Sequence, residues 1–209
     1  MLEKQGIYAI TPDENDSAKL VRDVEEVLRA GVTWLQYRNK HADPAKQLEQ
    51  AGLLRALCAM YSVPLIINDN VQLAFAVDAD GVHLGGDDDS ITHAREVLGS
   101  TKIIGASCYN DLHLAERAIA EGASYVAFGA VFASPTKPNA PSVALDVFRE
   151  AAQFAVPVVA IGGITADNGR QVVDAGADLL AMISGIFAAP DLTQAVRAYQ
   201  QCFRTQDEN

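Results

Sequence analysis

The chain has 209 residues, of which 49% are hydrophobic and 21% charged, with 15 glycines and 8 prolines. These proportions exclude an intrinsically disordered, collagen-like or coiled-coil protein. The formal net charge of −11 argues against binding to nucleic acid, whose phosphates need a basic surface, but a small anionic substrate is compatible with a local cluster of bases or a metal ion.

Short β-branched segments alternate with longer helix-like segments along the chain. The expected strands cover residues 7–11, 34–38, 64–68, 81–84, 103–107, 125–129, 156–161 and 179–183. The expected helices cover residues 17–30, 44–60, 71–77, 91–98, 112–121, 144–154, 168–175 and 192–203. This alternation predicts parallel strands joined by crossover helices, and eight units favour a closed TIM barrel over a doubly wound sheet. Because no linker interrupts the pattern, residues 1–209 are expected to form a single α/β domain.

The cysteines and the first residues indicate the cellular location. The three cysteines, Cys58, Cys108 and Cys202, lack the spacing of a disulfide framework or a zinc site. Residues 1–4 lead directly into a strand-like segment, and no apolar run approaches the roughly 20 residues of a membrane span. We therefore expect a cytoplasmic protein that has no signal peptide and is not bound to a membrane.

In a TIM barrel the chemistry lies at the carboxyl ends of the strands. Gln36, Arg38 and Lys40 share one side of the second strand if it stays extended that far, and would then present an amide and two cations to the mouth. Taken alone, this motif favours a solvated basic loop. Asn68 and Asp69 after the third strand are equally compatible with a helix cap and with a functional role.

The fourth and fifth strands are followed by further polar residues. The three acids at 87–89 form either a solvated, helix-capping turn or a site for Mg²⁺, which prefers carboxylates and water. We expect His83, within an apolar strand, to line the barrel rather than to bind a ligand. Ser107 is placed to donate a hydrogen bond into the mouth, but no His–Asp pair beside it supports nucleophilic catalysis.

The last three strand ends carry signals for anions. The proline-rich segment after the sixth strand contains Lys137, which favours a functional lid over a surface loop. Glycines after the seventh and eighth strands suit the phosphate site that recurs in this fold. Together the residues suggest a departing diphosphate, a second phosphorylated substrate and catalysis mostly by positioning and electrostatics. The proposed metal and cation cluster comprises Arg38, Lys40, Asn68, Asp69, Asp88 and Lys137.

With these motifs in this order, the chain resembles the thiamine phosphate synthase family from about residue 6 to residue 187. The matching motifs lie at residues 8–11, 36–40, 68–69, 79–85, 136–137 and 160–164. The resemblance implies a transferase in which an aminopyrimidine methyl diphosphate loses pyrophosphate with the help of Mg²⁺. The nitrogen of a thiazole phosphate, or of its carboxylate, then attacks the pyrimidine methylene to give thiamine phosphate.

The resemblance also implies roles for individual residues. It implies Asp69 and Asp88 as Mg²⁺ ligands, and Arg38, Ser107 and Lys137 as catalytic contacts. The implied substrate-binding residues are Gln36, Arg38, Lys40, Asn68, Ser107, Ser134, Thr136, Lys137, Gly163, Ile183 and Ser184. The implied partners are the two small molecules, and the sequence leaves homo-oligomer formation open.

The chain departs from the family pattern at three positions. Gly86 stands where the family often has glutamine, Tyr109 where many members have histidine, and Ser134 where threonine is more usual. The first two changes leave the pyrimidine side of the site less defined.

Two alternative functions are weighed. A thiazole tautomerase of the same pathway relies on a histidine just after the glycine of the sixth strand, where this chain has Ala130. A non-catalytic barrel that binds a phosphorylated ligand as a regulator would not need Asp69, Asp88 and Lys137 together.

Overall fold

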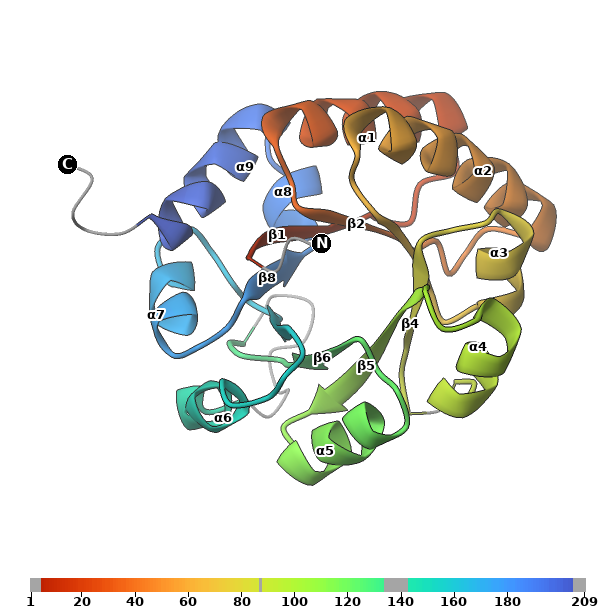
Figure 1. The fold of residues 1–209 in the computed structure, drawn as a ribbon. Helices are drawn as coiled ribbons and strands as arrows, with labels where there is room; N and C mark the ends of the chain where they lie inside the picture. Colours follow the sequence, from red (N-terminus) through yellow and green to blue (C-terminus); the bar gives the residue numbers. More distant parts are fainter. Residues whose placement is uncertain (1–4, 87, 134–142, 205–209) are drawn as a thin grey trace.

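A closed parallel barrel forms the centre of the computed structural model, which describes residues 5–86, 88–133 and 143–204. The strands pair in chain order, and β8 closes the ring against β1 (Figure 1). They are β1 (Gly6–Ile10), β2 (Trp34–Tyr37), β3 (Leu65–Asn68), β4 (Gly81–Leu84), β5 (Ile103–Tyr109), β6 (Tyr125–Phe128), β7 (Val158–Ile161) and β8 (Leu179–Met182). The expected α/β TIM barrel is confirmed.

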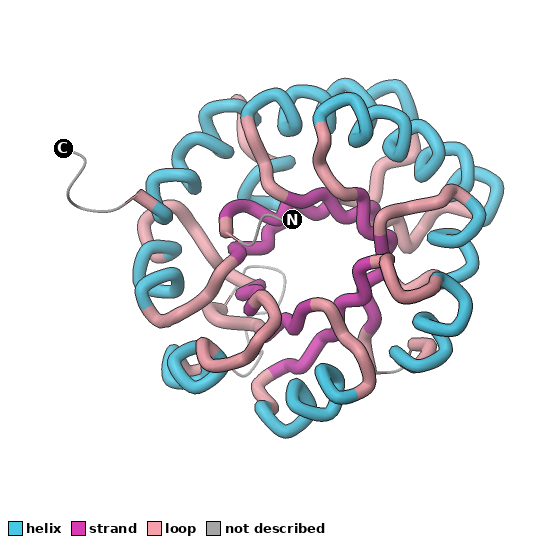
Figure 2. Tube along the Cα trace, in the orientation of Figure 1, coloured by secondary structure: helices cyan, strands magenta, loops and turns pink. Residues whose placement is uncertain are grey.

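Helices surround this barrel, as Figure 2 shows. They are α1 (Ser17–Ala30), α2 (Pro44–Tyr61), α3 (Val71–Ala76), α4 (Ile91–Leu98), α5 (Leu112–Ala120), α6 (Leu145–Ala151), α7 (Gly169–Asp174), α8 (Ser184–Phe187) and α9 (Leu192–Gln200), with a 3-10 turn, η1 (Gln201–Phe203), after α9. The short α8 is absent from the sequence prediction, and the helix expected over 192–203 divides into α9 and η1. Within the described part of the chain, no helix is long and apolar enough to span a membrane.

The alternation of side chains along each strand separates two cores. The larger core lies between the strands and the helices, and the smaller one fills the barrel interior. The buried members of the interior core are Tyr8, Ile10, Trp34, Ile66, Tyr125, Ala127, Val159, Leu179 and Ala181. Three of these are large aromatic residues that meet edge to face, so the interior is packed rather than open.

Candidate active site

The strand register brings the predicted site residues to one end of the barrel. Gln36 pairs with Ile10, and Asn68 pairs with His83 on the neighbouring strand. Ser107 lies near the end of β5, just before a bulge in its pairing with β6. The carboxyl ends of β2, β3, β4 and β5 therefore present their side chains to a common mouth.

Arg38 and Lys40 reach this mouth from a loop, not from an extended strand. The strand expected over 34–38 ends one residue earlier, at Tyr37, so the backbone does not stay extended to Lys40. The Arg38 N–H instead donates to Thr11 Oγ1 at 2.8 Å, and the Lys40 N–H donates to Asp13 Oδ1 at 2.6 Å. The loop thus folds onto side chains that follow β1.

Asp13 organises both cations, and the sequence prediction missed it. Its Oδ2 lies 2.9 Å from Arg38 Nη1, in addition to the bond from the Lys40 backbone. Burial opposes ionisation of this carboxyl, but the hydrogen bonds from Lys40 and Arg38 hold its pKa below the usual range. The available signal was its position just beyond the first strand, where the mouth of a barrel is formed.

Asn68 and Asp69 do not cap the next helix. Asn70 caps α3, because its side chain accepts a hydrogen bond from Leu73 N at 2.9 Å. Asp69 has a positive φ of 63° and donates its backbone N–H to His83 O at 2.8 Å. Its carboxylate lies 3.0 Å from Lys40 Nζ, so the structure brings these two predicted site residues together.

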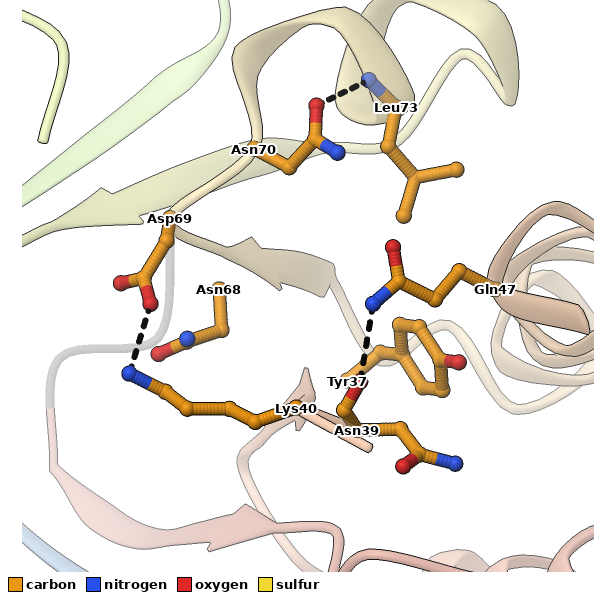
Figure 3. A pocket seen from close by; sticks show the side chains of 8 residues that line it. All are labelled: Tyr37, Asn39, Lys40, Gln47, Asn68, Asp69, Asn70 and Leu73. Carbon is orange, nitrogen blue, oxygen red and sulfur yellow. Dashed lines mark hydrogen bonds and ion pairs between the residues drawn. The ribbon is translucent and has the colours of Figure 1, made fainter. Parts of the chain in front are cut away.

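A cavity of about 220 Å³ opens beside this ion pair (Figure 3). Lys40, Asn68 and Asp69 line one side of it, while Tyr37 and Gln47 lie on the opposite side, toward α2. The cavity's other lining residues are Asn39, Asn70 and Leu73. The candidate site thus borders a cavity whose far wall belongs to the packing between β2 and α2.

Asp88 is likewise not a helix cap. Ser90 caps α4 by accepting from His93 N at 3.1 Å, and Asp88 Oδ2 accepts from Gly85 N at 2.6 Å. Burial raises the pKa of Asp88, and the neighbouring Asp69 carboxylate raises it further. Two mutually repelling carboxylates at adjacent strand ends form a donor set that a divalent cation suits.

This donor set fits Mg²⁺ better than a structural metal. Among the described residues, no three His, Cys, Asp or Glu side chains form a metal-binding group by themselves. Mg²⁺ commonly takes one or two carboxylates and fills its remaining positions with water and substrate phosphate oxygens. Asp69 and Asp88 satisfy this requirement at a mouth that also carries cations.

Ser107 and Gln36 are connected through the barrel interior. Ser107 Oγ lies 2.9 Å from His83 Nε2, and His83 Nδ1 lies 2.8 Å from the Tyr125 hydroxyl. The Tyr125 hydroxyl lies 2.8 Å from that of Tyr8, which accepts from Gln36 Nε2 at 2.8 Å. His83 lines the barrel as predicted, and burial lowers its pKa to about 4. The sequence prediction missed both tyrosines.

Two of the departures from the family pattern contact each other. The Gly86 N–H donates to the Tyr109 hydroxyl at 3.3 Å, and a Cβ on Gly86 would lie 3.4 Å from the same oxygen. Tyr109 is half exposed at the end of β5. The Tyr109 hydroxyl therefore lies next to the space that a side chain at position 86 would occupy.

The loops after β7 and β8 lie side by side, since Ile161 pairs with Ala181. Gly163 has a φ of +66°, and a Cβ there would lie 2.4 Å from Phe132 O. This glycine is therefore required by packing against the loop after β6, whatever its role toward a phosphate. Ile183 and Ser184 follow β8 at the start of the short α8.

Three predicted residues, Ser134, Thr136 and Lys137, lie outside the described residues, and their roles stay predictions. The described residues before them, Phe132 and Ala133, lie close to Gly163.

Comparisons with known proteins agree over nearly the whole chain. The family model described as thiamine monophosphate synthase matches residues 7–186. The thiamine-phosphate synthase of Azoarcus sp. (strain BH72) is 55% identical over 200 residues, which cover 95% of this chain and 97% of that protein. That of Methylobacillus flagellatus is 53% identical over 199 residues, 95% of each chain.

Solved structures show the same likeness. The thiamine phosphate pyrophosphorylase from Pyrococcus furiosus superposes with a TM-score of 0.85 at 36% identity, over 96% of each chain. The 3-hexulose-6-phosphate synthase structure, at 17% identity and a TM-score of 0.70, shares the fold. The expected enzyme class, a transferase of thiamine biosynthesis, is confirmed. The chain belongs to the thiamine monophosphate synthase family.

Proposed function

We propose that the chain joins 4-amino-2-methyl-5-pyrimidinylmethyl diphosphate to a thiazole phosphate, or its carboxylate, and releases pyrophosphate and thiamine phosphate, with carbon dioxide as a further product when the carboxylate is the substrate. The observation that carries this site assignment is one mouth combining the cations Arg38 and Lys40 with the carboxylates Asp69 and Asp88. A departing diphosphate needs fixed positive charge, and the carboxylates supply ligands for a cation that binds it.

Asp69 and Asp88 would hold Mg²⁺, which when bound neutralises charge on the diphosphate. Asp13 orients the Arg38 guanidinium before substrate arrives, because the two groups lie 2.9 Å apart. The Lys40 ammonium already lies 3.0 Å from Asp69 and so belongs to the same charged cluster. Charges fixed in advance stabilise a leaving group without reorganisation at the moment of reaction.

The two substrates take different walls of the mouth. Gln36 and Ser107, with Asn68, contact the pyrimidine diphosphate. Gly163, Ile183 and Ser184, together with Ser134, Thr136 and Lys137, bind the thiazole phosphate or reach the diphosphate. The C–O bond to the diphosphate breaks first, and its electron pair leaves with pyrophosphate; the thiazole nitrogen then uses its lone pair to form the new C–N bond to the pyrimidine methylene. This step needs no general base, only alignment and charge stabilisation.

The tautomerase alternative needs a proton-transfer group after Gly129, and the methyl group of Ala130 cannot serve. The regulatory alternative gives no reason for paired carboxylates beside two cations. We also place the reaction in the cytoplasm, and homo-oligomer formation stays open.

Pyrophosphate release tests the proposal directly. We expect release only when both substrates and Mg²⁺ are present, with thiamine phosphate formed in equal amount. Asp69→Asn and Asp88→Asn should each lower kcat by about a hundredfold or more, as deletion of a charge-stabilising contact does.

Asp89→Asn is the matched control, since it removes the same charge from the same acidic turn. Its kcat should stay within about twofold of wild type, as for other surface substitutions. Equal losses for Asp88→Asn and Asp89→Asn would overturn the metal assignment. Pyrophosphate release without the thiazole substrate, or full activity with a chelator present, would overturn the proposed reaction.

A further inference from the structure

A continuous chain of hydrogen bonds crosses the barrel interior from Gln36 to Ser107. Its three inner members, Tyr8, Tyr125 and His83, come from β1, β6 and β4. Every hydrogen bond in this series is 2.8 or 2.9 Å long. Both ends belong to the proposed substrate site, while the two tyrosines in the middle are enclosed by the packed interior.

The donors and acceptors along this chain can be assigned in order. Gln36 Nε2 donates to the Tyr8 hydroxyl, so Tyr8 uses its own hydrogen toward Tyr125. Tyr125 then donates to His83 Nδ1, which must lack a hydrogen. The neutral imidazole therefore carries its hydrogen on Nε2 and donates it to Ser107 Oγ.

The aromatic rings that carry these groups are held in place. Trp34 meets Tyr8 and Tyr125 edge to face, with ring centroids 5.4 and 5.0 Å apart, and His83 stacks on Tyr125 at 5.5 Å. A Cβ on Gly105 would lie 2.0 Å from Tyr125 Cζ. Because Gly105 has no side chain, the Tyr125 phenol can occupy the space beside it.

We propose that Tyr8, Tyr125 and His83 are positioning residues whose directional hydrogen-bond chain makes Gln36 an acceptor and Ser107 a donor toward the substrates. This inference rests on the proposed function. Because Gln36 uses an N–H inward, its amide oxygen stays available to an amino group on a pyrimidine. Because Ser107 Oγ accepts from His83, its hydroxyl hydrogen is free for a diphosphate, which offers only acceptor oxygens.

If the hydrogen bonds ran in the opposite direction, the donor and acceptor roles of Gln36 and Ser107 would be exchanged. Gln36 would accept from Tyr8, His83 would carry its hydrogen on Nδ1, and Ser107 would spend its hydroxyl hydrogen on His83. Ser107 could then donate nothing to a diphosphate. The tautomer of His83 therefore reports the direction of the whole chain.

Nitrogen-15 NMR of the full-length protein measures this tautomer. We expect a shift typical of a bare nitrogen at His83 Nδ1 and of a protonated nitrogen at Nε2. His83→Gln identifies these signals by their loss. A hydrogen on Nδ1 in the wild-type protein would overturn the proposal.

Steady-state kinetics test the two ends separately. Tyr125→Phe removes the donor to His83, so Ser107 loses its fixed role, and kcat should fall about tenfold with little change in KM. Tyr8→Phe removes the acceptor for Gln36, and the KM for the pyrimidine diphosphate should rise about fivefold, the value of one hydrogen bond.

A double-mutant cycle separates positioning from general loss of structure. In a Ser107→Ala background, Tyr125→Phe should cause no further fall in kcat, because the group it positions is gone. Additive losses would overturn the proposal. Tyr61→Phe is the matched control, since the Tyr61 hydroxyl donates to Glu25 Oε1 at 3.1 Å at the carboxyl end of α2, away from the strand ends that form the mouth. It should retain near wild-type kcat and KM.

Failure of the proposed function would look different. In that case the wild-type protein would form no thiamine phosphate, whatever the His83 tautomer. Failure of the positioning proposal would leave wild-type activity intact, while Tyr125→Phe matched Tyr61→Phe in kcat.

Discussion

Two buried tyrosine–glutamine pairs lie on opposite faces of the same barrel wall. Gln36 donates to Tyr8 at 2.8 Å in the interior, and Tyr37 donates to Gln50 at 2.9 Å between β2 and α2. The residue types and distances are nearly the same. The difference is where each set of hydrogen bonds ends, and this decides what each set does.

The outer set ends on the backbone. Gln50 Oε1 also accepts from Asn39 Nδ2 at 3.0 Å, and both side-chain amides donate to Glu14 O at 2.8 Å. It ties the loops after β1 and β2 to helix α2. The inner set ends on Gln36 and Ser107, whose side chains reach the mouth. A similar polar pair therefore stabilises the fold on one face and, in the proposal above, orients substrate contacts on the other.

The strongest way to break the inner set is Gly105→Val. The new side chain would overlap the Tyr125 ring, whose Cζ lies 2.0 Å from a Cβ at this position. Overpacking of this kind costs about 3 kcal/mol of unfolding free energy. Urea unfolding should show that loss, and the folded fraction should also lose kcat. Wild-type kcat in a folded Gly105→Val protein would contradict the role of Tyr125.

Gln50→Ala breaks the outer set instead. It leaves the Tyr37 hydroxyl and the Asn39 amide without their shared acceptor, which should cost about 2 kcal/mol of stability. No member of this set is a proposed substrate contact, so kcat of the folded protein should fall by less than the factor of about ten expected for Tyr125→Phe. Thermal unfolding and kinetics on the same preparation check both halves of the prediction.

The two sets should also differ in their response to acid. Burial lowers the pKa of His83 to about 4, partly offset by the Asp69 carboxylate. Between about pH 4 and 6.5 the unfolded chain, with a histidine pKa near 6.5, binds more protons than the folded protein does. The contribution of His83 to the free energy of unfolding is therefore fully present above about pH 6.5 and is lost as the pH falls toward 4.

The expected loss at pH 5 is about 1–2 kcal/mol relative to pH 7, because His83 keeps some exposure at the mouth. It is measured as the difference between wild type and His83→Gln, which cancels the carboxylates common to both. Gln50→Ala should keep the wild-type slope. Parallel slopes for wild type and His83→Gln would show that His83 is not the acid-sensitive group.

The smallest effect is expected from a second glycine. Gly52 lies in α2, and a Cβ there meets no atom within 4 Å. Gly52→Ala should stabilise the protein by about 0.5–1 kcal/mol through helix propensity alone. Denaturant unfolding measures this gain, and destabilisation would show that α2 depends on space at this position. The contrast with Gly105 separates a glycine needed for an aromatic neighbour from one that is not.

Alternating hydrophobicity was enough to predict the barrel, because each strand–helix unit carries its own local pattern. The path of the loop after β2 was not predicted, because Thr11 and Asp13 accept hydrogen bonds from the backbone N–H groups of Arg38 and Lys40. Those contacts join residues about 27 positions apart, which no local pattern reveals. The four-residue helix α8 is too short to show a helical period.

The site residues, like the fold, were predicted where the signal is local and missed where it depends on contacts between distant residues. Residues in the strand-end motifs were predicted, since polar side chains after apolar strands point to the mouth. Tyr8 and Tyr125 were missed because an aromatic residue in a strand reads as core, and only the folded barrel brings the two hydroxyls within 2.8 Å. Asp13 was missed because its meaning depends on Arg38, its partner across two loops.

The caps of α3 and α4 have a consequence for how such a mouth can change. The side chains of Asn70 and Ser90 cap these helices, so the carboxylates of Asp69 and Asp88 do not. A mutation of either acid therefore leaves the side-chain cap of the neighbouring helix in place. Substitutions at these two positions can therefore arise during evolution without the loss of stability that removing a helix cap would cause. This property helps one barrel fold to support many reactions.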